Sequence, residues 1–108
     1  MKLTNLIELL ITHKSLKQLY SEQKLNEESE AILIYMKDIL HIDSEIFFFE
    51  IEDTDDQLEY EVNGANYIQL FPLNHIADLI ESDLNLKNSG LSILQMAERL
   101  LEYRIKDA

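Results

Sequence analysis

The sequence contains no cysteine and no tryptophan, and it has one proline and two glycines in 108 residues. Without cysteine the chain can form neither disulfides nor thiolate metal sites, and it has no cysteine nucleophile. Small secreted domains often depend on disulfides, so we expect a protein of the bacterial cytoplasm. No apolar run approaches the roughly 20 residues that span a bilayer, which predicts a soluble protein without a membrane partner.

Basic residues are missing from the middle of the chain. Between Lys37 and Lys87 there is no Lys or Arg, whereas residues 38–86 hold thirteen of the 21 acidic residues. The formal net charge of −12 therefore arises in this central part. A field of this sign repels phosphate backbones and attracts basic surfaces. We expect a basic protein partner and no nucleic acid.

Apolar residues are plentiful in spite of the charge. Leu and Ile together supply 32 residues, and hydrophobic residues make up 46% of the chain. A chain of this length can bury roughly two-thirds of its unfolded surface around a single core. We therefore expect one folded, acidic domain over residues 1–108 rather than a disordered chain.

The first forty residues show helical spacing. Apolar residues recur in a helical pattern from Leu3 to Ile11. Ser15 and Gln18 then have the spacing of a capping box, so residues 4–24 form either one helix or two. Asn26 is a suitable cap for a further helix, whose wide apolar side over residues 31–40 predicts a central position in the core.

The period changes after residue 44. Residues 45–52, 57–62 and 65–71 alternate like strands. Pro72 then suits the first turn of a helix that continues to Leu84, and residues 91–106 predict a final helix with a Glu102–Lys106 pair. The predicted fold class is α+β, with N-terminal helices, a three-stranded antiparallel meander and two C-terminal helices.

The pairing of these strands follows from their side-chain pattern. A four-residue loop at Asp53–Asp56 places three apolar pairs on one face, which supports this register. The pairs are Ile51 with Leu58, Phe49 with Tyr60, and Phe47 with Val62. A two-residue Asn63-Gly64 turn would put Ile68 on the face of Glu59, so we expect a three-residue bulged loop that pairs Leu58 with Ile68.

No residue pattern indicates catalysis, a metal or a cofactor. The acidic loop Asp53–Asp56 fails as a calcium loop, because Leu58 and Gly64 occupy the positions that require Gly and Glu. His41 with Asp43, and His75 with Asp78, give too few ligands for zinc. We expect a chain that is not an enzyme.

One sheet face does suggest a binding surface. In the register above, Ile46, Phe48, Tyr67 and Phe71 lie beside four glutamates, and such a patch suits a basic partner. The candidate partner-binding residues are Phe48, Glu50, Glu52, Glu59, Glu61, Tyr67 and Phe71.

The functional hypothesis is a non-catalytic domain that docks a basic protein, in the manner of an immunity protein or inhibitor. It requires the four glutamates to face outward together and to stay free of Arg99 and Arg104. Two alternatives remain open at this point. A terminal helix of the chain could cover the aromatic end, or a second copy could bury it, which would give a structural homodimer.

Overall fold

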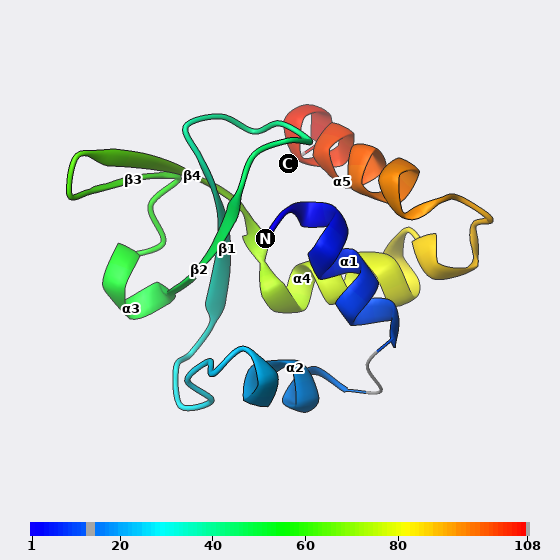
Figure 1. The fold of residues 1–108 in the computed structure, drawn as a ribbon, viewed down its shortest axis with the longest axis horizontal. Helices are drawn as coiled ribbons and strands as arrows, with labels where there is room; N and C mark the ends of the chain where they lie inside the picture. Colours follow the sequence, from blue (N-terminus) through cyan, green and yellow to red (C-terminus); the bar gives the residue numbers. More distant parts are fainter. Residues whose placement is uncertain (13–14, 108) are drawn as a thin grey trace.

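Helices open and close the chain, and a four-stranded antiparallel sheet lies between them (Figure 1). The computed structural model describes residues 1–12 and 15–107. The strand order is β2-β1-β4-β3. The elements are α1 (Leu3–Thr12), α2 (Leu16–Glu22), β1 (Ile32–Lys37), β2 (Ile46–Glu50), α3 (Ile51–Thr54), β3 (Glu59–Val62), β4 (Ala65–Pro72), α4 (Leu73–Asp78), a π-helical segment (Leu79–Asp83), a 3-10 turn (Leu86–Asn88) and α5 (Ile93–Asp107).

The predicted N-terminal helices are confirmed, and they are two. Ser15 caps α2, because its Oγ accepts a hydrogen bond from the backbone N–H of Gln18 at 3.4 Å. In α1 the buried residues are Leu3, Leu6 and Ile7. His13 and Lys14, where a break was expected, lie outside the described residues.

The predicted helix from Asn26 to Leu40 is wrong. Residues 32–37 form β1, an interior strand of the sheet, and five consecutive residues, Ile32–Met36, are buried. Because both sides of this strand are covered, both of its alternating sets are apolar, and the run imitates a wide helical face. The Asn26 side chain closes a turn instead, with its Oδ1 accepting from Glu28 N at 3.0 Å.

The predicted pairing of the strand at residues 45–52, which corresponds to β2, is also wrong. β2 pairs with β1 and places Phe47 opposite Tyr35 and Phe49 opposite Leu33. The short helix α3 begins in the predicted strand, at Ile51, and overlaps the predicted hairpin loop. The chain then crosses from one edge of the sheet to the other before β3 begins. The error follows from the missed strand β1, which takes the place assigned to β3.

The turn between β3 and β4 has two residues rather than three. Asn63 and Gly64 have φ values of 52° and 80°, as a type I′ turn requires, and Val62 pairs with Ala65. The predicted bulged loop is therefore wrong. Glu59 does pair with Ile68, and it remains exposed because β3 is an edge strand.

The two C-terminal helices are confirmed with shifted ends. Pro72 ends β4 and precedes α4, which continues as the π-helical segment. α5 begins at Ile93, because Ser92 and Gln95 form a capping box: Ser92 Oγ accepts from Gln95 N at 3.1 Å, and Ser92 N donates to Gln95 Oε1 at 2.9 Å. The expected Glu102–Lys106 pair is present at 3.7 Å.

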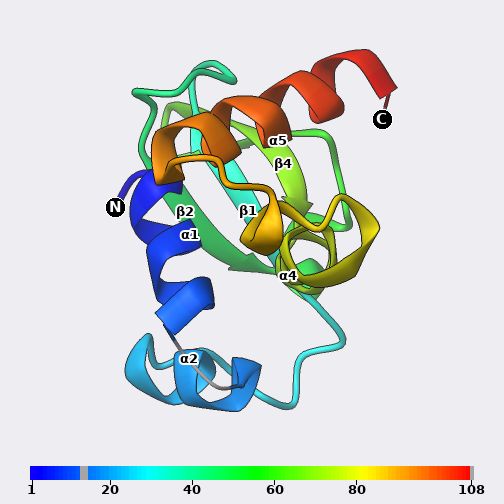
Figure 2. The same cartoon turned by 90° about the vertical axis from the view of Figure 1, so that its right-hand side faces the viewer.

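The main core lies between one face of the sheet and the helices. Figure 2 shows α1, α4 and α5 in front of the strands, and the covered face contributes aliphatic residues such as Ile32, Ile34 and Met36. Among residues 1–12 and 15–107, no helix has the length and apolarity that crossing a bilayer requires. The face of the sheet opposite α1, α4 and α5 carries only the short helix α3 among the described helices (Figure 1).

Candidate functional site

The face of the sheet away from α1, α4 and α5 carries a cluster of aromatic rings. Its register places these side chains together, because Tyr35 pairs with Phe47 and Tyr67 pairs with Tyr60. In Figure 1, α3 lies on the opposite side of the sheet from α1 and α4. We call this surface the aromatic face and define it by Tyr35, Phe47, Phe49, Tyr60 and Tyr67.

Phe49 stands at the centre of the aromatic face. Its ring centroid lies 5.4 Å from those of Tyr35 and Tyr60, 5.2 Å from that of Tyr67 and 6.5 Å from that of Phe47. Three of the four contacts are edge-on, the geometry that aromatic quadrupoles favour. Except for Tyr35, which is fully buried, the rings are half-buried.

These contacts bring rings from the two edges of the sheet together over its central strands. Phe49 and Tyr60 come from β2 and β3, which form opposite edges. In a flat sheet, strands three positions apart are separated by about 14 Å. A bulge in β4, opposite Ile34 and Tyr35, increases the local twist and bend. The rings of the two edge strands therefore lean toward each other across β1 and β4 and form one continuous cluster.

A buried polar network closes one end of the aromatic face. Tyr35 Oη donates to the carbonyl oxygen of Gln57 at 2.5 Å. Gln69 Nε2, from β4, lies 3.2 Å from Tyr35 Oη and 3.0 Å from Asp56 Oδ1. The Gln69 side chain belongs to a residue only 7% exposed, so these hydrogen bonds satisfy groups that could not reach water. The network holds the segment after α3 against the sheet.

Exposed carboxylates flank the aromatic face at both ends. One group follows β2, and the other lies in the loop between β1 and β2, which is held to the sheet by a 2.8 Å hydrogen bond from Asp38 N to Asn66 O. Lys37, paired with Tyr67, is the basic residue that the strands place on this face. The exposed carboxylates are Asp53, Asp55 and Asp56 at one end, and Asp38, Asp43 and Glu45 at the other.

The aromatic residues predicted to bind a partner do not share one face. Phe48 and Phe71 both pair with Ile34 and therefore lie on the helix-covered face. Phe71 is 5% exposed and its ring contacts Tyr103 of α5. Tyr67 lies on the aromatic face. The predicted surface is therefore not assembled, and a part in partner binding stays a prediction for Phe48 and Phe71.

The four glutamates of the predicted surface are split between the two edges of the sheet. Glu59 and Glu61 are exposed on β3. Glu50 and Glu52 lie at the β2 edge, where Glu50 Oε1 accepts from Asn26 Nδ2 at 3.1 Å. Within the described chain, none of the four pairs with Arg99 or Arg104. Their binding role is likewise still a prediction.

Glu52 has internal partners of its own. Its Oε1 accepts from Ser29 Oγ at 2.5 Å, and its Oε2 accepts from Glu30 N at 2.9 Å. The Ser29 hydrogen bond, followed by the backbone hydrogen bond from Glu30, lowers the pKa of Glu52 from its ordinary value. Glu52 therefore ties α3 to the segment before β1.

The alternation of the strands predicts Phe47, Phe49 and Tyr60 on the face opposite the candidate binding surface, that is, in the core. They do share a face, as the pattern predicted, but this face is the one opposite α1, α4 and α5. The signal that could have found them is chemical: alternation in β2, β3 and β4 gathers most of the rings on one face, although Phe48 and Phe71 lie on the other. Partial exposure suits large rings better than aliphatic side chains.

The described residues form no cluster of three or more His, Asp or Glu side chains that could hold a metal ion. His41 Nδ1 lies 3.8 Å from Asp43 Oδ2 and accepts from Asp43 N. His75 stacks near Phe71, with ring centroids 4.9 Å apart. Both histidines are therefore accounted for by local contacts.

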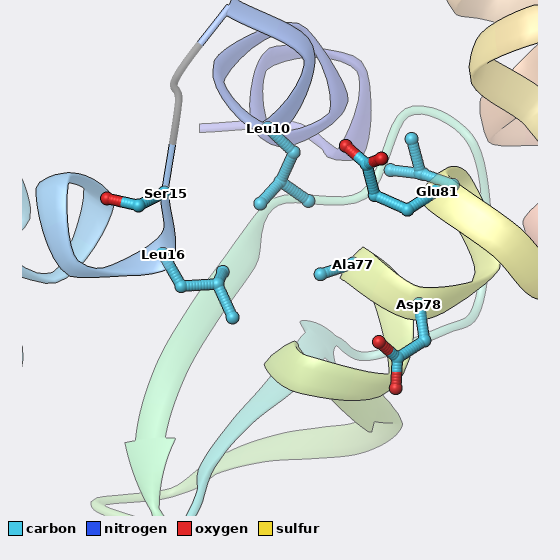
Figure 3. Close-up of a pocket in the computed structure, with 7 residues that line it drawn as sticks. Leu10, Ser15, Leu16, Ala77, Asp78 and Glu81 are labelled. Carbon is cyan, nitrogen blue, oxygen red and sulfur yellow. The ribbon is translucent and has the colours of Figure 1, made fainter.

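The structure also has a hollow of about 350 Å³ between α1, α2 and α4. In Figure 3, Leu10, Leu16 and Ala77 face a common space, and Asp78 and Glu81 lie on its rim. Its described lining contains carboxylates but no histidine.

The fold and the aromatic face together define an α+β domain whose sheet is covered by α1, α4 and α5 on one face and only in part, by α3 and the segment after it, on the other (Figure 1). The chain matches no protein-family model, no curated protein and no solved structure. Its function is therefore argued from the aromatic face and the charges around it.

Proposed function

We propose that this chain is a non-catalytic binding domain that docks a basic protein on its aromatic face. The observation that carries the proposal is the continuous cluster of half-buried rings with exposed carboxylates at both ends. Neither feature alone specifies a partner. Together they combine an apolar centre with an oriented charge.

The rings supply the burial that a stable complex needs. Phe47, Phe49, Tyr60 and Tyr67 are each half-buried in the free protein, so a partner removes further apolar area from water. Aromatic side chains are enriched among the residues that dominate binding energy, and these four are already ordered by mutual ring contacts. Little conformational entropy is then lost on docking.

The carboxylates supply steering and select the sign of the partner. The two acidic groups flank the rings, and residues 38–86 contain no Lys or Arg. The bases beside them are Lys37 on the face and Lys2, whose Nζ lies 3.8 Å from Asp43 Oδ1, so the acidic residues remain in excess. A basic surface approaching this side is accelerated at low salt and slowed as salt screens the field. A second copy of the chain would bring like charges together, which disfavours a homodimer through the same face.

A capture experiment with matched variants tests this function. The tagged chain is used at low salt on an extract of its host, and retained proteins are identified by mass spectrometry and then purified. We expect one basic protein that binds in a purified system, elutes with salt and is lost by Phe47→Ser. The control Leu94→Ser changes a residue of α5 that is 50% exposed and should retain the partner.

Three outcomes would overturn the proposal. Retention that ignores salt removes the electrostatic argument, and retention that Phe47→Ser leaves unchanged removes the aromatic face. Light scattering provides the third, since a stable dimer that Phe47→Ser converts to a monomer would assign the face to a second copy of the chain.

A further inference from the structure

The free edge of β4 carries a second candidate site, distinct from the aromatic face. β3 pairs with β4 only as far as Glu59 and Ile68, with one further hydrogen bond from Gln69 N to Leu58 O at 2.8 Å. β4 itself continues to Pro72. Where β3 ends, a hollow of about 250 Å³ lies beside the strand. Its lining is Leu58, Gln69, Leu70, Phe71, His75 and Arg104.

Arg104 of α5 is the cation of this hollow. Its Nε donates to the carbonyl oxygen of Gln69 at 3.2 Å, which fixes the half-buried side chain against the strand. Among the residues whose side chains are described, Arg104 has no ion pair. By contrast, Arg99 and Lys106 of the same helix both lie 3.7 Å from Glu102 Oε1. The terminal guanidinium nitrogens of Arg104 are therefore donors available to a ligand.

The rest of the lining has three apolar residues, Leu58, Leu70 and Phe71, together with Gln69 and His75, and it lacks carboxylates. Leu70 and Phe71 are 2% and 5% exposed and form the floor, whereas Leu58 is 62% exposed and stands at the opening. Each of the four other hollows that we compared has at least one carboxylate in its wall. In a chain with 21 acidic residues, an arginine in a hollow whose described lining has no carboxylate is a specific arrangement.

We propose that this hollow binds a small monocarboxylate with an apolar body. The planar guanidinium of Arg104 matches the two oxygens of a carboxylate, and Leu58, Leu70 and Phe71 accept the apolar body. A cavity of about 150 Å³ already holds a benzene ring, so the volume here suits a ring with a carboxylate. The net charge of −12 disfavours ligands with two or more negative charges.

A titration followed by nuclear magnetic resonance tests this site with 4-methylbenzoate as the probe. We expect saturable shifts of the backbone amides of Leu58, Gln69 and Phe71 and of the Arg104 Nε–H signal. Its neutral analogue, 4-methylbenzamide, should bind at least about tenfold more weakly, because it lacks the charge-assisted hydrogen bonds. Terephthalate, with two carboxylates, should also bind more weakly.

Variants separate a local contact from a change of net charge. Arg104→Gln should raise the dissociation constant about tenfold, whereas Arg99→Gln, with the same loss of charge on the same helix, should leave it unchanged. Arg104→Lys keeps the charge without the planar fork, and Leu58→Ser removes an apolar wall at an exposed position. Both should fold and both should bind more weakly.

The proposal is overturned if the amide binds as tightly as the carboxylate, or if Arg99→Gln weakens binding as much as Arg104→Gln. Shifts confined to other parts of the molecule would overturn it as well. Its outcome is independent of the proposed function, because Arg104 and Phe71 lie away from the aromatic face.

Discussion

The sheet face under α1, α4 and α5 is built mainly from aliphatic side chains, with Phe48 and Phe71 among them, whereas the opposite face is built mainly from rings. Ile32, Ile34 and Met36 on the covered face are at most 3% exposed. On the aromatic face, Phe47 and Tyr67 keep part of their surface in water. Both faces are apolar, so apolarity alone does not distinguish a core from a binding surface. The type of apolar residue and the layer above it do.

The comparison also separates the sources of stability. The covered face gains its free energy from complete burial against helices, about 25 cal/mol for each Å² of apolar area. The aromatic face gains part of its stability from ring contacts and from the polar network of Tyr35 and Gln69. We therefore expect large losses of stability on the first face and smaller losses, with loss of binding, on the second.

The largest expected effect comes from truncating the covered face. Ile34→Ala removes a side chain that is fully buried, so it should lower the free energy of unfolding by about 2–5 kcal/mol. Phe47→Ala, at a half-exposed ring, should cost less than half as much. Urea unfolding followed by circular dichroism measures both. Equal losses would mean that the aromatic face is a second closed core.

A smaller effect is expected from the polar network under the rings. Tyr35→Phe removes the hydroxyl that donates to Gln57 O and accepts from Gln69 Nε2, and it should cost about 1–3 kcal/mol. Tyr60→Phe is the matched control, because the Tyr60 hydroxyl has no hydrogen bond with the described residues. Urea unfolding of the two variants should differ by most of this amount, and equal values would contradict the network's contribution.

Local signals in the sequence predicted the ends of several elements. The Ser15 cap and the amphipathic patterns of α1 and α5 gave the helices close to their observed positions. The Asn63-Gly64 dipeptide also indicates the observed two-residue turn. The sequence favours a three-residue loop only if Glu59 is not allowed on the same face as Ile68. On an edge strand that pairing is inexpensive, since the carboxylate reaches water.

The non-local parts of the fold could not be read in the same way. The buried run Ile32–Met36 satisfies both a helical and a strand pattern, and only the layers on both sides of β1 decide between them. A prediction without β1 lacks the partner of β2, and it places Phe48 beside Tyr67 rather than on the face covered by the helices. The predicted alternation of side chains along β2 and β3 agrees with the structure. The strands have other neighbours than predicted, so other residues share a surface.

The smallest expected effect concerns the tie between α3 and the segment before β1. The two hydrogen bonds to Glu52 lower its pKa below the ordinary value of 4.5 in the folded chain. Because the folded-state pKa is the lower one, the resulting stability is present above 4.5 and is lost as the pH falls through the folded-state value. Stability should depend on pH accordingly.

Glu52→Gln should therefore be less stable than the native chain at neutral pH, and the difference should shrink as acid protonates Glu52. Urea midpoints measured along a pH series test this. Ser29→Ala removes one of the two donors and should reproduce part of the difference, while the double variant should lose less than the sum of the two. If the difference in urea midpoint between Glu52→Gln and the native chain stays constant with pH, Glu52 stabilises the fold through packing. The charge of its hydrogen-bonded carboxylate would then contribute nothing to the free energy of unfolding.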